Sequence, residues 1–191
     1  DRQTLKTLHK KALIEHFEEE KTAPKPVRLL KLPLPLNAEQ QQAVNAVLSV
    51  YAKTQPTDIT SRYQGFLLNG VTGSGKTEVY LQIMQTVLEA GRQVLILVPE
   101  IGLTPQTQAR FAGRFSARLC LLHSGLSDSQ RMQGWLDCQN GQAQIIIGTR
   151  STVLYPFANL GMIIVDEAHD SSYKQQDTLR YHACNVALYR W

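Results

Sequence analysis

GVTGSGKT, at residues 70–77, decides the fold of this chain, because it matches the phosphate-binding pattern G-x-x-x-x-G-K-[ST] at every specified position. Glycines in such a loop let successive backbone N–H groups turn toward phosphate oxygens. Lys76 is expected to reach the β- and γ-phosphates of a nucleotide, and Thr77 to offer its hydroxyl to Mg²⁺. The predicted nucleotide-binding residues are Gly70, Val71, Thr72, Gly73, Ser74, Gly75, Lys76 and Thr77. The alternative is a chance glycine-rich turn.

The context of the loop argues against a chance turn. An apolar run at Gly65–Asn69 predicts a strand before it, and a helix from Lys76 to Ala90, stopped by Gly91, is predicted after it. Later apolar runs predict further strands at 94–98, 119–122, 145–147 and 162–165, with helices at 105–115 and 128–138. Short β-branched runs that alternate with helices are typical of a parallel sheet buried on both faces. The predicted fold class is α/β, with a central, mainly parallel sheet flanked by helices.

A pair of acids follows the last predicted strand, in Asp166-Glu167-Ala168-His169. Ligands of parallel α/β sheets bind at the carboxyl ends of the strands. Asp166 is expected to hold Mg²⁺, and Glu167 to orient and polarise an attacking water. The predicted catalytic residues are Lys76, Asp166 and Glu167. The predicted magnesium ligands are Thr77 and Asp166. The alternative is a strand end capped by surface acids.

Three other strand-end loops carry hydroxyl and basic side chains, of which Ser124, Thr149 and Arg150 are the candidates for contacting nucleic acid. Hydroxyls and helix N-termini suit contacts with a phosphate backbone that read no base sequence. The alternative for each is an ordinary helix cap.

The N-terminal part predicts a domain boundary. Residues 2–20 have the periodicity of an amphipathic helix, so residues 1–20 are expected to be the C-terminal helix of a preceding domain. Four prolines make residues 21–36 a stiff, extended linker. Residues 37–191 form the predicted ATP-binding lobe, which opens on a capping box between Asn37 and Gln40.

Composition sets weaker bounds. The formal net charge of +4 suits a polyanionic partner, although many basic domains bind nothing charged. The three cysteines form no C-x-x-C pair, and reduced thiols suit a cytosolic protein. No apolar run reaches the roughly 18 residues that a membrane span needs, so no membrane partner is expected.

The sequence resembles the N-terminal motor lobe of the bacterial primosomal replication-restart DNA helicases, the PriA family (superfamily two, DEAH type). The motifs that carry the resemblance are GVTGSGKTEVY (70–80), VPEIGLTPQ (98–106), LHSGL (122–126), GTRS (148–151), DSSYKQQ (170–176) and RYHA (180–183). The resemblance implies a RecA-like P-loop NTPase lobe. It implies an ATP-dependent helicase that moves 3′ to 5′, recognises stalled or collapsed forks and helps assemble the primosome.

The resemblance also implies roles for single residues. Residues 36–40 look like the glutamine motif, in which Gln40 would bind adenine; the alternative is a solvent-facing glutamine. Residues 170–181 would form an aromatic-rich loop that links DNA occupancy to ATP hydrolysis. The residues implied in coupling and DNA contact are His169, Tyr173, Lys174, Arg180 and Tyr181, and the alternative for the loop is a packed surface loop.

Cofactors, partners and location follow from the same resemblance. The implied cofactors are ATP and Mg²⁺, and the zinc of the full-length family would have its ligands outside this chain. The implied partners are forked and single-stranded DNA, primosomal proteins and single-strand-binding protein, in the bacterial cytoplasm at the nucleoid.

The chain departs from the family in two ways. Cys184-Asn185 stand where the family has Arg-Asp, which puts local coupling in question. The Ser-Ala-Thr motif, the zinc-binding cysteines and the second motor lobe, which supplies an arginine to the ATP site, are absent from these 191 residues. The chain alone is therefore expected to bind nucleotide weakly and turn over little. Two other functions stay open, a nucleotide-dependent binding module and an unrelated P-loop enzyme.

Overall fold

The computed structural model describes residues 2–11, 25–53, 64–71, 73–177 and 179–190. Its centre is a parallel sheet of four strands in the order β2-β3-β1-β4. The strands are β1 (Gln93–Leu97), β2 (Leu119–Leu122), β3 (Ile145–Gly148) and β4 (Leu160–Val165). The predicted α/β fold with a parallel sheet is confirmed.

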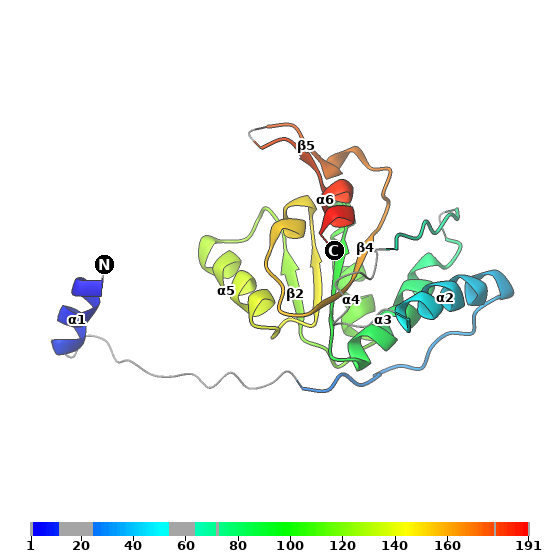
Figure 1. The fold of residues 1–191 in the computed structure, drawn as a ribbon, viewed down its shortest axis with the longest axis horizontal. Helices are drawn as coiled ribbons and strands as arrows, with labels where there is room; N and C mark the ends of the chain where they lie inside the picture. Colours follow the sequence, from blue (N-terminus) through cyan, green and yellow to red (C-terminus); the bar gives the residue numbers. More distant parts are fainter. Residues whose placement is uncertain (1, 12–24, 54–63, 72, 178, 191) are drawn as a thin grey trace.

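Helices cover both faces of the sheet, as the unbroken apolar strands require. Residues 94, 96 and 98 face α3 (Lys76–Glu89) and α4 (Pro105–Ala112), whereas residues 95 and 97 face the other layer. That layer contains α5 (Asp128–Gln139), α6 (Ala183–Tyr189) and the short 3-10 helix η2 (Arg150–Leu154). Figure 1 shows α2 (Ala38–Tyr51) packed outside α3, and α5 on the opposite side of the sheet.

The predicted helix caps are present. Asn37 and Gln40 form a reciprocal capping box at the start of α2, and Ser127 and Gln130 form another at the start of α5. Gly91, with φ of +70°, follows the end of α3, where the left-handed conformation favours glycine.

The predicted strand at Gly65–Asn69 is wrong: this segment has no regular secondary structure and belongs to no sheet, and Leu67 is 89% exposed. A strand is held by hydrogen bonds to a neighbouring strand. Within the described residues, the neighbours of β1 are β3 and β4, and no strand pairs with the outer edge of β4. Only Leu68 of the run packs, against the cluster that Val44 of α2 forms with Val79 and Ile83 of α3.

Two other predicted elements differ in length. Helix α4 ends at Ala112 rather than at Phe115, because Phe115 forms an antiparallel bridge with Leu29 of the proline-rich segment. Helix α1 covers Arg2–Lys10, and the rest of the predicted N-terminal helix, from residue 12, lies outside the described residues. No helix in the described ranges is long and apolar enough to span a membrane.

Candidate nucleotide-binding site

The phosphate loop leads directly into α3. Gly75 is the N-cap of that helix, and both Gly75 and Gly73 have φ of +82°, a conformation that glycine adopts without strain. A Cβ on Gly75 would lie 2.5 Å from Nε2 of Gln40, so any side chain at this position would displace the Gln40 amide from the loop. The loop therefore has the backbone that a phosphate cradle needs, although Thr72 lies outside the described residues.

Lys76 folds back over this loop. Its Nζ donates hydrogen bonds to the carbonyl oxygens of Gly70, at 2.7 Å, and Val71, at 3.1 Å. An anion in the loop would offer the same ammonium charged acceptors, which form stronger hydrogen bonds than neutral carbonyls. The Lys76 ammonium thus lies against the loop, and its contact with phosphates stays a prediction.

Gln40 contacts the loop from α2. Its Nε2 donates to the carbonyl of Ser74 at 2.8 Å, and its Oε1 accepts the backbone N–H of Asn37 at 2.9 Å. Both ends of the amide are thus engaged within the protein. The structure places Gln40 against the phosphate loop rather than in open solvent, and its contact with adenine stays a prediction.

A hollow beside the loop brings the two predicted magnesium ligands together. Thr77 from α3 and Asp166 from the end of β4 both line it, with Tyr80, Thr107 and Arg110. Hydroxyl and carboxylate oxygens are donors that suit Mg²⁺. The side chains present therefore fit this ion.

Asp166 is in an unfavourable place for a charge. Burial, and then the neighbouring charge of Glu167, raise the pKa of its carboxyl, while the Glu167 N–H, Lys76 and the Tyr80 hydroxyl act in the opposite direction. Burial and the two carboxylates raise the pKa of Tyr80 to about 12, so its hydroxyl stays a donor to Asp166. A divalent cation would relieve the repulsion between Asp166 and Glu167.

Glu167 has an unusual backbone. Its φ of +46° is the left-handed conformation, and no other non-glycine residue in the described part of the chain has a positive φ. Backbone outliers of this kind cost about 1–3 kcal/mol and concentrate at functional sites. The Glu167 side chain is 44% exposed and lies 3.6 Å from Nε2 of the exposed His169. Its carboxylate is therefore accessible to water, as the predicted role requires.

We expect Asp166→Asn to raise the melting temperature of the Mg²⁺-free protein, because asparagine keeps the shape without the buried charge. A chain of this size gains about 2–4 °C per kcal/mol. The pKa is raised in the folded state, so the unfolded carboxyl ionises first as pH rises, and stability falls until the folded carboxyl also ionises. The difference in melting temperature between Asp166→Asn and the parent should therefore be largest near pH 7.5 and should vanish below the ordinary aspartate pKa. Thermal melts at both pH values test this, and a pH-independent difference would contradict it.

The candidate DNA contacts divide into two groups. Ser124, Lys174 and Arg180 are exposed, and Tyr181 is half-buried. Lys174 lies in β5 (Lys174–Gln175) and Arg180 just before β6 (Tyr181–His182), two short antiparallel strands that form a ribbon. Figure 1 shows this ribbon projecting beyond the sheet layer. These side chains can reach a nucleic acid that lies against the ribbon.

Tyr173, Thr149 and Arg150 differ from the expectation of a direct DNA contact. Tyr173 is 0% exposed and packs against Leu97 and Ala183, so its ring offers no face to a base. Thr149 is only 6% exposed, because its N–H bonds to the Leu122 carbonyl and draws the loop into the sheet edge. The Arg150 guanidinium donates to the carbonyl of Ser172 at 3.0 Å and so binds the segment that carries Tyr173.

The buried Tyr173 connects the segment before β5 to the end of β4, which the sequence did not predict. Its hydroxyl lies 2.6 Å from the carbonyl oxygen of Asp166 and 3.0 Å from that of Leu97. Tyr80 was also missed, although it lies four residues after Lys76 and therefore on the same face of α3.

The loop before α3 combines glycines in the left-handed conformation with a lysine, and it lies near an acid pair at the end of β4. This arrangement defines the P-loop class of nucleotide-binding lobes. Within that class, the chain belongs to the DEAD/DEAH box helicase family, whose model matches residues 37–188. The predicted RecA-like lobe is thereby confirmed, and the chain carries the motor-lobe motifs of a replication-restart helicase.

Individual relatives and a solved structure support the same family assignment. The chain is 57% identical over 128 residues to replication restart protein PriA of Haemophilus influenzae, covering 67% of this chain and 18% of that protein. It is 44% identical over 190 residues to replication restart protein PriA of Bacillus subtilis, covering 98% and 23%. The structure of RecG bound to a three-way DNA junction matches with a TM-score of 0.61 and 25% identity, over 83% of this chain and 23% of that one. The chain thus spans about a fifth of the length of these relatives.

Proposed function

We propose that this chain is the ATP-binding lobe of a replication-restart DNA helicase, which uses ATP hydrolysis to move 3′ to 5′ along DNA at stalled or collapsed forks. The proposal rests on one observation. Thr77 and Asp166 line the same hollow, beside the phosphate loop that the Lys76 ammonium contacts. The similarity to the replication restart proteins supports it.

In this function each residue of the site has a distinct task. The backbone of residues 70–75 and the Lys76 ammonium bind the phosphates, while Thr77 and Asp166 hold Mg²⁺. The ion, when bound, neutralises charge that develops on the phosphoryl oxygens. Glu167 orients the attacking water and accepts its proton. Gln40, in contact with Ser74, ties the start of α2 to the loop and contacts adenine.

DNA acts on this site through the ribbon. Lys174 and Arg180 meet phosphates, and Tyr181 supplies an aromatic ring, while the exposed His169 and Ser124 lie near the strand ends. Thr149 and Arg150 hold the neighbouring loops in place through their hydrogen bonds to Leu122 and Ser172. Tyr173 directly precedes β5, and its hydroxyl contacts the backbone of Asp166. A displacement of the ribbon is therefore transmitted to Asp166, the magnesium ligand, through the Tyr173 side chain.

Tyr173→Phe is expected to lower the maximal DNA stimulation of ATP hydrolysis about fivefold. The lost hydrogen bond is worth about 1 kcal/mol, and it is the direct contact between the ribbon segment and Asp166. The matched control is Tyr181→Phe, which keeps the ring for stacking and should leave stimulation unchanged. Titrating DNA into an ATPase assay measures both. Equal effects of the two variants would contradict the coupling role of Tyr173.

The partners and remaining parts belong to the same proposal. The substrates are ATP with Mg²⁺ and forked or single-stranded DNA, and primosomal proteins and single-strand-binding protein act with the full-length protein in the bacterial cytoplasm, at the nucleoid. The second motor lobe completes the ATP site, so the 191 residues alone turn over little. Zinc belongs to the full-length family, and the described residues hold no cluster of three or more His, Cys, Asp or Glu that could bind a metal.

A strand-displacement assay tests the proposal. Full-length protein should unwind forked DNA with ATP and should require a 3′ tail on the loading strand. Fork binding without unwinding would instead identify a nucleotide-dependent binding module. An ATPase rate indifferent to DNA would identify an unrelated P-loop enzyme.

A further inference from the structure

The proline-rich segment before the lobe is docked along it. We call Lys25–Leu34 the strap; Figure 1 shows it in blue, running along the underside of the lobe toward α2. The Leu30 N–H donates to the Arg114 carbonyl at 2.8 Å, and the Ser116 N–H donates to the Arg28 carbonyl at 2.8 Å. The partly buried side chains of Val27 and Leu29 pack on the core beneath α3. The strap is thus an integral part of the lobe rather than a free linker.

One carboxylate oxygen joins the strap to the phosphate-binding helix. Oε1 of Glu78 accepts hydrogen bonds from the Leu34 N–H at 3.0 Å, from Gln82 Nε2 at 3.0 Å and from Arg114 Nη2 at 2.7 Å. Gln82 Nε2 also contacts the Leu34 carbonyl, at 2.9 Å. The hydrogen bonds of the Glu78 carboxylate therefore depend on the position of this part of the strap.

Arg114 completes the connection from the other side. Its Nη1 donates to the carbonyl of Leu32 at 2.9 Å, so one guanidinium binds both the strap and Glu78. The side chains of Arg114 and Glu78 are only 6% and 12% exposed. Removing one partner of such a buried ion pair leaves the other charge uncompensated, which is strongly destabilising.

The position of Glu78 in α3 gives this network its consequence. Gly75 caps the helix, and Lys76, Thr77 and Glu78 are its first three residues. A helical turn is rigid, so a shift of Glu78 also shifts the ammonium of Lys76 and the hydroxyl of Thr77.

We infer that Glu78 is a positioning residue for the phosphate loop, and that strap docking and nucleotide binding are thermodynamically coupled through Glu78 and Arg114. Coupling is reciprocal: nucleotide stabilises the docked strap, and the docked strap raises nucleotide affinity. Whatever precedes residue 25 can then act on the ATP site by pulling on the strap. This inference rests on the proposed binding of nucleotide at Lys76.

The direct test is hydrogen exchange of the 191-residue chain with and without a saturating, nonhydrolysable ATP analogue and Mg²⁺. Nucleotide should slow exchange of the Leu30 and Leu34 amides, which donate to Arg114 and Glu78, by about fivefold or more. The Ala143 amide, bonded to Asp137 on the far side of the sheet, is the internal control and should change far less.

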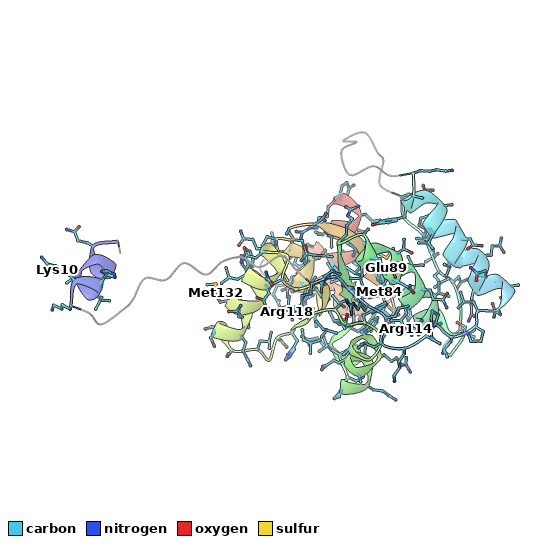
Figure 2. The ribbon with its side chains drawn as sticks, turned by 90° about the horizontal axis from the view of Figure 1, so that it is seen from below. Lys10, Met84, Glu89, Arg114, Arg118 and Met132 are labelled. Atoms are coloured by element: carbon cyan, nitrogen blue, oxygen red, sulfur yellow. The ribbon has the colours of Figure 1, made fainter. Side chains whose placement is uncertain are left out.

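A variant tests the residue itself. Glu78→Gln should weaken binding of a fluorescent ATP analogue by about fivefold or more and remove the nucleotide effect on the Leu34 amide. The control is Arg118→Met, which breaks a second arginine–carboxylate pair of 2.7 Å, between Arg118 and Asp137. Figure 2 labels both arginines, with Arg114 on the side of α3 and α4 and Arg118 nearer α5. The control should leave nucleotide affinity and strap exchange unchanged.

The outcomes separate the two proposals. Nucleotide that binds without slowing exchange at Leu30 and Leu34 overturns the coupling and leaves the proposed function standing. The 191 residues are expected to bind nucleotide weakly, so the analogue is titrated up to about 1 mM, and no binding at that concentration overturns both. If Glu78→Gln does not fold, the exchange measurement on the parent chain still decides.

Discussion

Lys76→Ala is expected to lower ATP hydrolysis by the full-length protein by about 10²–10³-fold, the usual cost of removing one preorganised donor from a developing negative charge. Alanine also removes a charged hydrogen-bond donor worth about 1.5–3 kcal/mol, so nucleotide affinity should fall by about 10–100-fold. Among the described residues, the Nζ of Lys76 donates to the loop carbonyls of Gly70 and Val71, so the variant should keep the fold. Steady-state ATPase rates and titration with a fluorescent ATP analogue measure the two effects.

The matched control for this variant is Lys53→Ala, which removes an exposed lysine just beyond α2, away from the hollow. It should leave both measurements within about twofold of the parent, as surface substitutions away from a site do. Equal losses in the two variants would mean that general positive charge, rather than the loop cation, supports hydrolysis.

Glu167→Gln should separate binding from chemistry. A side chain that activates water acts on the transition state alone, so hydrolysis should fall by about 10²–10⁴-fold while nucleotide affinity stays within about threefold. Glutamine keeps the length and polarity of the side chain, but it cannot accept the proton. Single-turnover hydrolysis and nucleotide titration give the two numbers.

Glu89→Gln, at the far end of α3, is the control for the change of charge. Its carboxylate accepts a hydrogen bond from Gln85 at 2.8 Å, away from the loop, and the variant should hydrolyse ATP at the parental rate. A Glu167→Gln protein that hydrolyses ATP normally would remove Glu167 from the catalytic set. A parallel loss of binding and rate would show that it supports the fold of the site.

Local signals predicted much of this lobe. The loop at 70–77 and the capping boxes at Asn37 and Ser127 depend on residues a few positions apart. The structure contains both capping boxes, and Gly73 and Gly75 have the left-handed backbone that such a loop uses. The buried strands β1 and β3 were also predictable, because their apolar runs have no polar alternation.

Features that depend on distant partners were not predictable from a single sequence. Tyr173 reads as a surface aromatic, but it is buried by Leu97, which lies 76 positions away. The proline-rich segment reads as a linker, yet the Lys25 carbonyl is bound by Gln144, 119 positions away. Gly65–Asn69 has the composition of a strand, but a strand also requires a hydrogen-bonding neighbour, which composition does not reveal.

The most direct test of the central claim is the rate of ATP hydrolysis by the full-length protein with and without forked DNA. A motor lobe whose acid pair is linked to a DNA-facing ribbon predicts a rate that rises at least about tenfold with DNA, as product release and domain closure become coupled to the strand. A rate that DNA leaves unchanged would contradict the account, because the ribbon of Lys174 and Arg180 would then have no influence on Asp166.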